Sequence, residues 1–419
     1  MAKERIITGI DVGSTKVSTT VASVLDNRIS VIGVSGSVPS KDINKGKIAN
    51  IDSAVECISA SLERAERMAG VSVSSAFVTI SGSHIETTNS HGVVAVSPVG
   101  SEITPEHVAR VIEAARAVSL SSSREIIHVI PRDFIVDSQD GIKDPVGMSG
   151  IRLEVETNII HGLTPAIKNL ARCIQQVGVD VESIVYTGIA SAEAVLTDTE
   201  KELGTVLIDF GGGVTSIIAF LEGSPIYSAV LPIGAKYITN DLAIGLRTRL
   251  DSAEKVKIKL SEERVDMMSS DRNKKIEDFD ASAFGLDLDM EIIPRRFLYE
   301  IIDARLNEIF KLINLEIAKA NLQDKLPSGV VITGGGALTY GIEKVAKNVL
   351  RMPARLGYQR GVTGLIDEIQ GPAFSANVGA ILYGVRQFKN ESLLSFESRG
   401  GNIKGKLSKF FEKLKSFLP

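Results

Sequence analysis

Apolar and β-branched residues lead to Asp209, three glycines interrupt them, and a second β-rich run continues to Phe220. This pattern predicts a β-hairpin over Val206–Phe220. Glycine in the turn tolerates positive φ and leaves the backbone amides open to a docking phosphate, while Asp209 is placed to hold a magnesium ion through water. Taken singly, the same pattern is also ordinary hairpin chemistry, because Gly-Gly turns are common.

A second copy of the design lies near the N-terminus, over Ile6–Ala22. Sliding one segment over the other superposes Asp11 on Asp209 and Gly13 on Gly211. The chain therefore looks internally duplicated. Two such hairpins facing each other across a cleft would clamp a polyphosphate from both sides, each with an acid for the metal.

A third glycine-rich strand end follows at Ser328–Ala337, where the run Thr-Gly-Gly-Gly leads to a predicted helix over Ile342–Leu350. Such a turn lets the backbone approach a flat or charged ligand. Its recurrence favours a nucleotide site over three unrelated turns.

Composition limits the class of protein. A length of 419 residues predicts two domains or more, and a net charge of -4 does not indicate nucleic-acid binding. Cys57 and Cys173 are isolated, which favours buried thiols over a disulfide or zinc site. No stretch approaches the ~18 apolar residues of a membrane-spanning helix, so we expect a cytoplasmic body.

The order of elements indicates an α/β fold. Strands at Ile29–Val34 and Val73–Ser81 flank a helix at Ile51–Met68. Between His84 and His161 the character changes to a polar stretch, a helix capped by Thr104 and several short strands, which we interpret as an inserted subdomain. The five histidines, at positions 84, 91, 107, 128 and 161, show no metal-ligand spacing.

In a helix starting near Asp251, Glu254 and Lys257 share a face. From periodicity alone, an exposed salt bridge is the favoured interpretation of this pair. A long amphipathic helix is predicted from Pro294 through Ile313.

Two Asp-apolar-Gly hairpins, a small-residue helix at Ile189–Leu196 and the late triple glycine resemble the nucleotide site of the actin, Hsp70 and sugar-kinase superfamily. Within it, the chain resembles the FtsA family of actin-like bacterial division proteins. The resemblance is strongest at Arg124–Phe134, Gly141–Arg152 and Ile238–Thr248, and it spans residues 6 to 388 and the extreme C-terminus.

The resemblance implies an actin-like ATPase fold with two duplicated lobes around a nucleotide cleft. Residues 1–84 and 162–192 would form the first lobe, 85–161 the inserted self-assembly subdomain, and 193–387 the second lobe, with 228–302 as its outer part. Residues 388–403 would be a flexible linker and 404–419 an amphipathic membrane-targeting helix.

It also implies an ATP and Mg²⁺ site. The first phosphate loop would be Asp11, Gly13, Ser14, Thr15 and Lys16, and the second Asp209, Gly211, Gly212, Gly213 and Thr215. Glu254 and Lys257 would flank the nucleoside, and Gly334, Gly335 and Gly336 the adenosine. Asp11 and Asp209 would hold the metal.

One position departs from the superfamily pattern. Relatives usually carry Glu or Gln on the connecting helix to orient the attacking water, and Gly188 aligns there. Without that group, a water-orienting contribution of ~100-fold or more to the rate of hydrolysis is missing. We therefore expect Mg-ATP binding with slow or undetectable hydrolysis.

The C-terminus predicts a membrane-surface helix. Apolar residues recur at helical spacing, and five lysines against one glutamate give residues 404–419 a side-chain charge of +4. The apolar stripe would enter the interface while the lysines meet anionic headgroups. The alternative is a core helix that docks back on the body. The proposed contacts are Leu407, Phe410, Phe411, Leu414, Phe417 and Leu418, with Lys404, Lys406, Lys409 and Lys413.

The resemblance implies a self-assembling scaffold at the cytoplasmic face of the cell membrane, at the division site. It would anchor the tubulin-like FtsZ and help recruit later division proteins. The FtsZ tail would dock near Arg295, Arg296 and Arg305, although solvated surface charge is the default interpretation of those arginines. The alternatives are a metabolic small-molecule kinase of the same superfamily and an FtsA-like pilus-assembly protein.

Overall fold

The computed structural model describes residues 4–26, 28–96, 102–269, 278–282, 292–365 and 367–397. Its first lobe is built on a sheet of order β12-β7-β1-β2-β3-β20, with β4 (Val38–Pro39) pairing with β2. These strands are β1 (Arg5–Val12), β2 (Lys16–Leu25), β3 (Arg28–Val34), β7 (Ser75–Ile80), β12 (Asp180–Tyr186) and β20 (Thr363–Gly364). The short pair β5 (Ile43–Asn44) and β6 (Lys47–Ile48) lies outside this sheet.

The second lobe repeats the arrangement in a sheet of order β15-β14-β13-β18-β19. Its strands are β13 (Thr205–Phe210), β14 (Thr215–Leu221), β15 (Ser224–Leu231), β18 (Val330–Thr333) and β19 (Ala354–Leu356). Asp11 pairs antiparallel with Ser18 and parallel with Thr79. Asp209 pairs in the same two ways with Ser216 and Thr333. The predicted duplication of the two hairpins is therefore present strand by strand.

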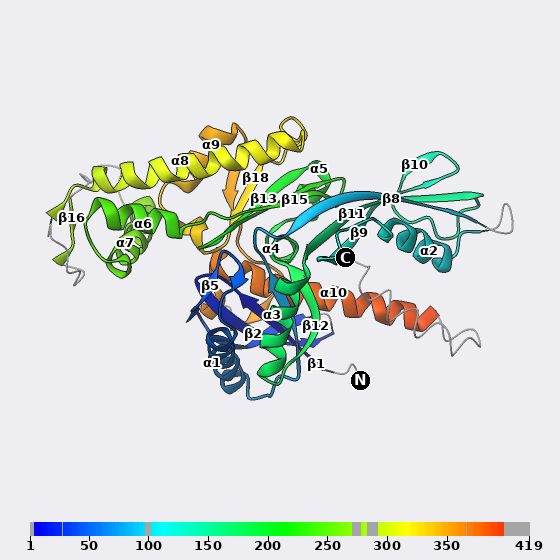
Figure 1. The fold of residues 1–419 in the computed structure, drawn as a ribbon, viewed down its shortest axis with the longest axis horizontal. Helices are drawn as coiled ribbons and strands as arrows, with labels where there is room; N and C mark the ends of the chain where they lie inside the picture. The colour runs from blue at the N-terminus through cyan, green and yellow to red at the C-terminus, as the bar shows by residue number, and fades with distance from the viewer. Residues whose placement is uncertain are drawn as a thin grey trace.

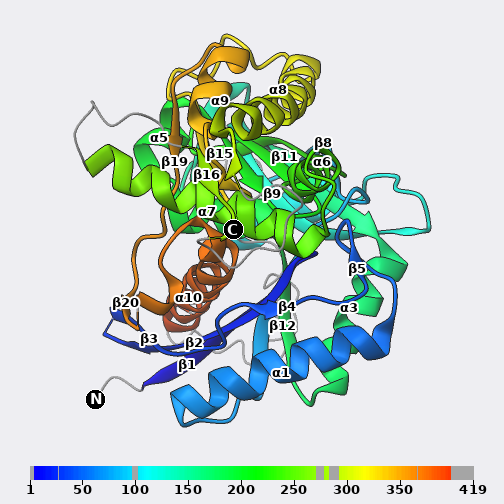
Figure 2. The ribbon, with the colours of Figure 1, turned by 90° about the vertical axis from the view of Figure 1, so that its left-hand side faces the viewer.

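Helix α4 (Thr187–Val195) contacts strands of both sheets and packs against α10 (Ser375–Glu397), which lies on the first sheet (Figure 1). A Cβ at Gly379 of α10 would stand 1.7 Å from the carbonyl oxygen of Ala190, so only glycine permits this approach. One hydrophobic core joins both lobes, because it contains residues of the first sheet together with Leu207 and Ile218 of the second sheet. Helices α1 (Ile51–Ala69) and α3 (Thr164–Gln176) cover the outer face of the first sheet (Figures 1 and 2).

The inserted region forms its own sheet, of order β10-β9-β11-β8, which extends away from the lobes (Figure 1). Its elements are β8 (Glu86–Ala95), α2 (Pro105–Arg116), β9 (Arg124–Val136), β10 (Gln139–Ile142) and β11 (Arg152–Leu163). The polar stretch after His84 belongs to β8, and β9 is one long strand where short strands were expected. The alternation of apolar and polar residues that marks a strand could not be recognised there, because both faces of these strands carry polar residues.

The outer part of the second lobe contains α6 (Lys236–Gly245), α7 (Leu250–Ser269), β16 (Phe279–Asp280), β17 (Ile292–Ile293) and α8 (Arg295–Lys319). Helix α8 buries Ile302, Leu306, Ile309 and Ile313 as its sequence period predicts, whereas Ile301 is half-buried and Leu312 is 36% exposed. Two further helices, α5 (Asp198–Leu203) and α9 (Ile342–Leu350), pack against β14 and β19.

Helix α10 continues to Glu397, so residues 388–397, which we expected to begin a flexible linker, are helical. The predicted amphipathic helix at 404–419 lies outside the described residues. Within the described part of the chain, no helix combines the length and apolar character that a membrane crossing needs.

Candidate functional site

A cavity of about 820 Å³ lies where the two lobes meet, at the carboxyl ends of β1 and β13. The two glycine-rich turns line it from opposite sides. Each turn is closed by the same hydrogen bond: Gly13 N–H donates to Lys16 O (2.9 Å) and Gly211 N–H donates to Val214 O (3.0 Å). The hairpins predicted to face each other across a cleft do so.

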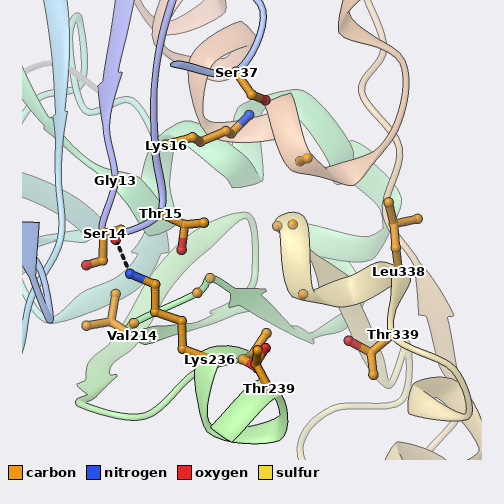
Figure 3. A pocket seen from close by; sticks show the side chains of 18 of the residues that line it. Gly13, Ser14, Thr15, Lys16, Ser37, Val214, Lys236, Thr239, Leu338 and Thr339 are labelled. Carbon is orange, nitrogen blue, oxygen red and sulfur yellow. Dashed lines mark hydrogen bonds between the residues drawn. The ribbon is translucent and has the colours of Figure 1, made fainter. Parts of the chain in front are cut away.

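The turns approach so closely that side chains are excluded from the second one. A Cβ at Gly212 would stand 1.8 Å from Thr15 Oγ1, and one at Gly213 would stand 2.7 Å from Ser14 Cβ. Figure 3 shows Ser14 and Thr15 beside this contact. The run of glycines is thus required by the approach of the opposite loop.

Two carboxylates line the cavity, of which Asp209 is buried and Asp11 is half-buried. Asp11 accepts a hydrogen bond from Thr79 Oγ1 (2.6 Å), and Asp209 accepts one from Ser191 Oγ (2.5 Å). Burial raises the pKa of both groups, that of Asp209 to about 6, and the charge of Asp11 adds to the shift at Asp209. Their oxygens form a donor set suited to a hard cation such as Mg²⁺.

Lys16 places an unpartnered ammonium in the same cavity. Its Nζ is buried and has no hydrogen-bond partner among the described residues, although it lies 3.5 Å from the ring centroid of Phe374. Burial lowers its pKa to about 8, against the opposing effect of Asp11 and Asp209. A buried cation without hydrogen bonds is costly, so the cavity is built for an anion that satisfies it.

Glu254 and Lys257 also line the cavity, and they are not the exposed pair that periodicity favoured. Lys257 is only 7% exposed, and its Nζ lies 2.7 Å from Glu254 Oε2 and 2.9 Å from Thr239 Oγ1. Burial lowers the pKa of Lys257. Helical spacing could not show this, because the covering residues come from α6.

The third glycine run closes another side of the cavity. Gly334 has φ of +85°, and a Cβ there would stand 2.4 Å from Asp209 Oδ1. A Cβ at Gly336 would stand 2.6 Å from the Phe210 ring. Gly334 and Gly336 therefore bring backbone against the second hairpin, whereas a Cβ at Gly335 would meet only Ala373, at 3.8 Å.

One predicted site residue is placed elsewhere, and one was missed. Among the described residues that line the cavity, Thr215 is absent, because it is fully buried and its hydroxyl donates to Ile233 O (2.7 Å). Lys236 lines the cavity and donates from Nζ to Ser14 O at 2.6 Å (Figure 3). No sequence motif marks Lys236; only the topology brings it to the first loop.

Gly188 is buried near the start of α4. A Cβ at this position would stand 2.5 Å from the ring of Tyr186, whose hydroxyl reaches Ile217 O and Ala229 O at 3.4 and 3.3 Å. A glutamate or glutamine would therefore collide with a side chain that is held in place by the second lobe.

The three arginines predicted to bind an acidic tail lie on α8, apart from the cavity. Arg305 is bound by Asp241 (2.5 and 2.8 Å) and by Glu308, and the exposed Arg296 pairs with Glu300 (2.8 Å). Arg295 lies 5.7 Å from the Phe279 ring centroid. The charge of Arg305 is thus satisfied within the protein.

Two lobes of equivalent topology, each with a glycine turn and an aspartate at a shared cavity, define the actin-like ATPase fold. Solved structures agree on the fold. A PilM-PilN type IV pilus biogenesis complex matches with a TM-score of 0.63 at 15% identity, covering 90% of this chain and 98% of that chain. MreB5 of Spiroplasma citri bound to ADP matches with a TM-score of 0.51 at 13% identity, covering 94% and 98%.

Sequence relatives narrow the class to one family. The chain is 39% identical over 412 residues to cell division protein FtsA of Borreliella burgdorferi, covering 97% of this chain and 98% of the relative. It is 36% identical to that of Pseudomonas aeruginosa (91% and 90% covered) and 32% identical to that of Escherichia coli K12 (92% and 92%). Family models for the SHS2 domain inserted in FtsA and for cell division protein FtsA match residues 82–161 and 206–379. The chain belongs to the FtsA family of cell division proteins.

Proposed function

We propose that the cavity between the lobes binds Mg-ATP. The observation that carries this proposal is the buried ammonium of Lys16, which has no hydrogen-bond partner among the described residues and lies in a cavity lined by both glycine-rich turns. A polyphosphate supplies the missing acceptor for Lys16 and fits the backbone donors of glycine turns. Related folds support this ligand, since structures of MreB5 of Spiroplasma citri are bound to ADP and to AMPPNP.

In this proposal, Asp11 and Asp209 hold Mg²⁺ through water, and Lys16 meets the phosphates. The metal would neutralise part of the phosphate charge and allow ionised carboxylates to remain in the cavity. Glu254 and Lys257 lie on the nucleoside side, and the glycines at 334–336 pack beside the adenosine. The carboxylate pair suits this role because each aspartate keeps an oxygen that Thr79 or Ser191 does not occupy.

We propose that hydrolysis is slow. The steric contact between position 188 and Tyr186 leaves no space for the water-orienting side chain of other relatives. A bound nucleotide would then act mainly by holding two lobes together, with chemistry as a secondary event.

At the level of the cell, the proposed role is a membrane-tethered, self-assembling scaffold of bacterial division. It anchors FtsZ filaments to the inner face of the cytoplasmic membrane and helps to recruit later division proteins. Membership of the FtsA family supports the division role. The basic, amphipathic sequence of residues 404–419 supports the membrane tether.

The FtsZ tail would dock on the outer part of the second lobe. Beside Arg295 and Arg296, α6 and α8 expose apolar side chains: Ile244 is 76% exposed and Phe297 is 41% exposed. A Cβ on Gly245 would meet both Ile301 (2.7 Å) and Phe297 (3.7 Å), which places the end of α6 against α8. We call Ile244 and Phe297 the apolar patch. An acidic amphipathic peptide fits an apolar patch with an arginine rim.

Two alternatives predict different behaviour. A metabolic kinase needs a substrate base in the cavity, and a pilus-assembly protein has no use for a basic amphipathic C-terminus. The structural similarity to the PilM-PilN complex concerns the fold alone.

Co-sedimentation separates these functions. The full chain is spun with anionic vesicles, with and without Mg-ATP and an FtsZ tail peptide. The scaffold proposal predicts that the protein pellets with vesicles and brings the peptide down. A protein that stays in the supernatant and turns over ATP with a small acceptor would be a kinase instead.

A further inference from the structure

Lys236, the first residue of α6, contacts both glycine-rich turns at once. Its backbone N–H donates to Gly212 O of the second turn (2.9 Å). Its Nζ donates to Ser14 O of the first turn (2.6 Å), which Figure 3 shows as a dashed line. The preceding residue, Ala235, donates from its N–H to Gly211 O (2.9 Å). Lys236 is therefore fixed to one lobe by its backbone and to the other by its side chain.

Ser14 is held from other directions as well. Its Oγ accepts a hydrogen bond from Gly46 N–H (2.9 Å), within the first lobe, and a Cβ at Gly213 would stand 2.7 Å from its Cβ. The first turn is thus tied to the segment between β5 and β6. Because the two ends of the Lys236 contact belong to different lobes, separating the lobes breaks it.

We propose that Lys236 is a positioning residue that clasps the two turns and sets the equilibrium between closed and open lobes. A ligand that binds only the closed state gains affinity in proportion to the population of that state. Although Lys236 lines the cavity, its proposed effect on affinity acts through the position of the two lobes. Only this effect on ligand affinity rests on the proposed nucleotide function; the clasp itself concerns the ligand-free protein.

The expected size of the effect on ligand affinity follows from the kind of contact that Lys236 makes. A charged donor to a carbonyl strengthens a closed state, but Lys236 is an exposed residue and water competes for its ammonium. We expect loss of the clasp to change the closed-to-open ratio, and with it the apparent dissociation constant for Mg-ATP, by roughly 3- to 10-fold.

The test measures the distance between the lobes directly. Spin labels at Met68→Cys on α1 and Leu315→Cys on α8 report this distance, since both positions are exposed (47% and 57%) and Cys57 and Cys173 are buried. Distance distributions are recorded with and without Mg-ATP for the full chain, for Lys236→Met and Lys236→Gln, and for Lys236→Arg. Lys344→Met, an exposed lysine on α9, is the matched control.

Without ligand, the proposal predicts a shift to longer or broader distances in Lys236→Met and Lys236→Gln, and wild-type distances in Lys236→Arg and Lys344→Met. Wild-type distances in both neutral variants would overturn it, even if Mg-ATP bound more weakly, because Lys236 would then act on the ligand directly. If the wild-type chain bound no Mg-ATP, the proposed function would fail while the ligand-free distances still decided the clasp.

Discussion

Lys16 is a single side chain through which ligand binding to the cavity can be tested. Because its ammonium is buried without a hydrogen-bond partner among the described residues, it destabilises the ligand-free protein and becomes favourable only when an anion satisfies it. Lys16→Met should weaken Mg-ATP binding by about 10- to 100-fold, the range for a charged hydrogen bond. The same change should leave the melting temperature of the ligand-free protein unchanged or raise it.

Calorimetric titration and thermal unfolding measure these two effects on one sample. Lys344→Met, at an exposed position that does not line the cavity, is the control for charge removal. Equal affinity in Lys16→Met and the wild type would show that the ammonium does not meet the ligand.

His128 predicts the dependence of stability on pH. Its Nε2 accepts a hydrogen bond from Tyr186 N–H (2.9 Å), and burial lowers its pKa to about 4, against about 6.5 in an unfolded chain. The unfolded state therefore binds the proton more readily. Stability from this group is present above pH 6.5 and is lost as the pH falls towards 4, by about 3 kcal/mol at most.

Buried His84, whose pKa is lowered to about 4 by burial and by Lys47 and Arg124, acts in the same direction, while the raised pKa of Asp209 opposes both. His128→Gln keeps an acceptor for Tyr186 but cannot be protonated. Its melting temperature should fall less between pH 6.5 and 4.5 than that of the wild type. Parallel curves for the two proteins would exclude His128 as a titrating group.

At the scale of elements, α6 and α8 present the apolar patch. Ile244→Ser should weaken binding of the FtsZ tail peptide by about tenfold, because an exposed side chain loses its apolar contact with the peptide but supports nothing in the fold. Leu315→Ser is the matched control. Leu315 is 57% exposed and lies on the same helix as Phe297, several turns away. Fluorescence anisotropy of a labelled peptide gives both affinities. Equal losses in the two variants would place the peptide elsewhere.

The elements also show what the sequence could predict. The sequence predicts both hairpins, α1, α8 and the triple-glycine turn, because apolar periodicity and glycine runs are local signals. The inserted sheet was harder, since β8 and β9 carry polar residues on both faces.

The site was predictable where backbone chemistry marks it, at Asp11, Asp209 and the glycines between them. Lys236 could not be found, and Glu254 with Lys257 could not be distinguished from surface charge, because their partners come from other elements. Thr215 was misplaced for a related reason: the direction of its side chain depends on the strand register. The resemblance to a family, rather than periodicity, placed Glu254 and Lys257 at the cavity.

For the whole molecule, the proposed division role includes attachment to a membrane. We predict that the full chain pellets with anionic vesicles and that Phe410→Glu, which puts a charge into the apolar stripe, reduces the bound fraction at least about tenfold. Added salt should reduce it too, because the lysines act through screened charge. Lys344→Met controls for loss of a positive charge outside the C-terminus. Pelleting that is unchanged by both the substitution and the salt would show that residues 404–419 do not tether the protein to the membrane.

Nucleotide binding is the function supported by the duplicated lobes, since the two hairpins, Lys16 and the third glycine run converge on one cavity. Isothermal titration of the full chain with Mg-ATP, followed by measurement of phosphate release from the same sample, tests whether that cavity binds ATP and how slowly it is hydrolysed. We predict one ATP bound per chain and turnover far below the ~10 s⁻¹ that is typical of enzymes. Absence of binding at millimolar ATP, or brisk turnover, would contradict it.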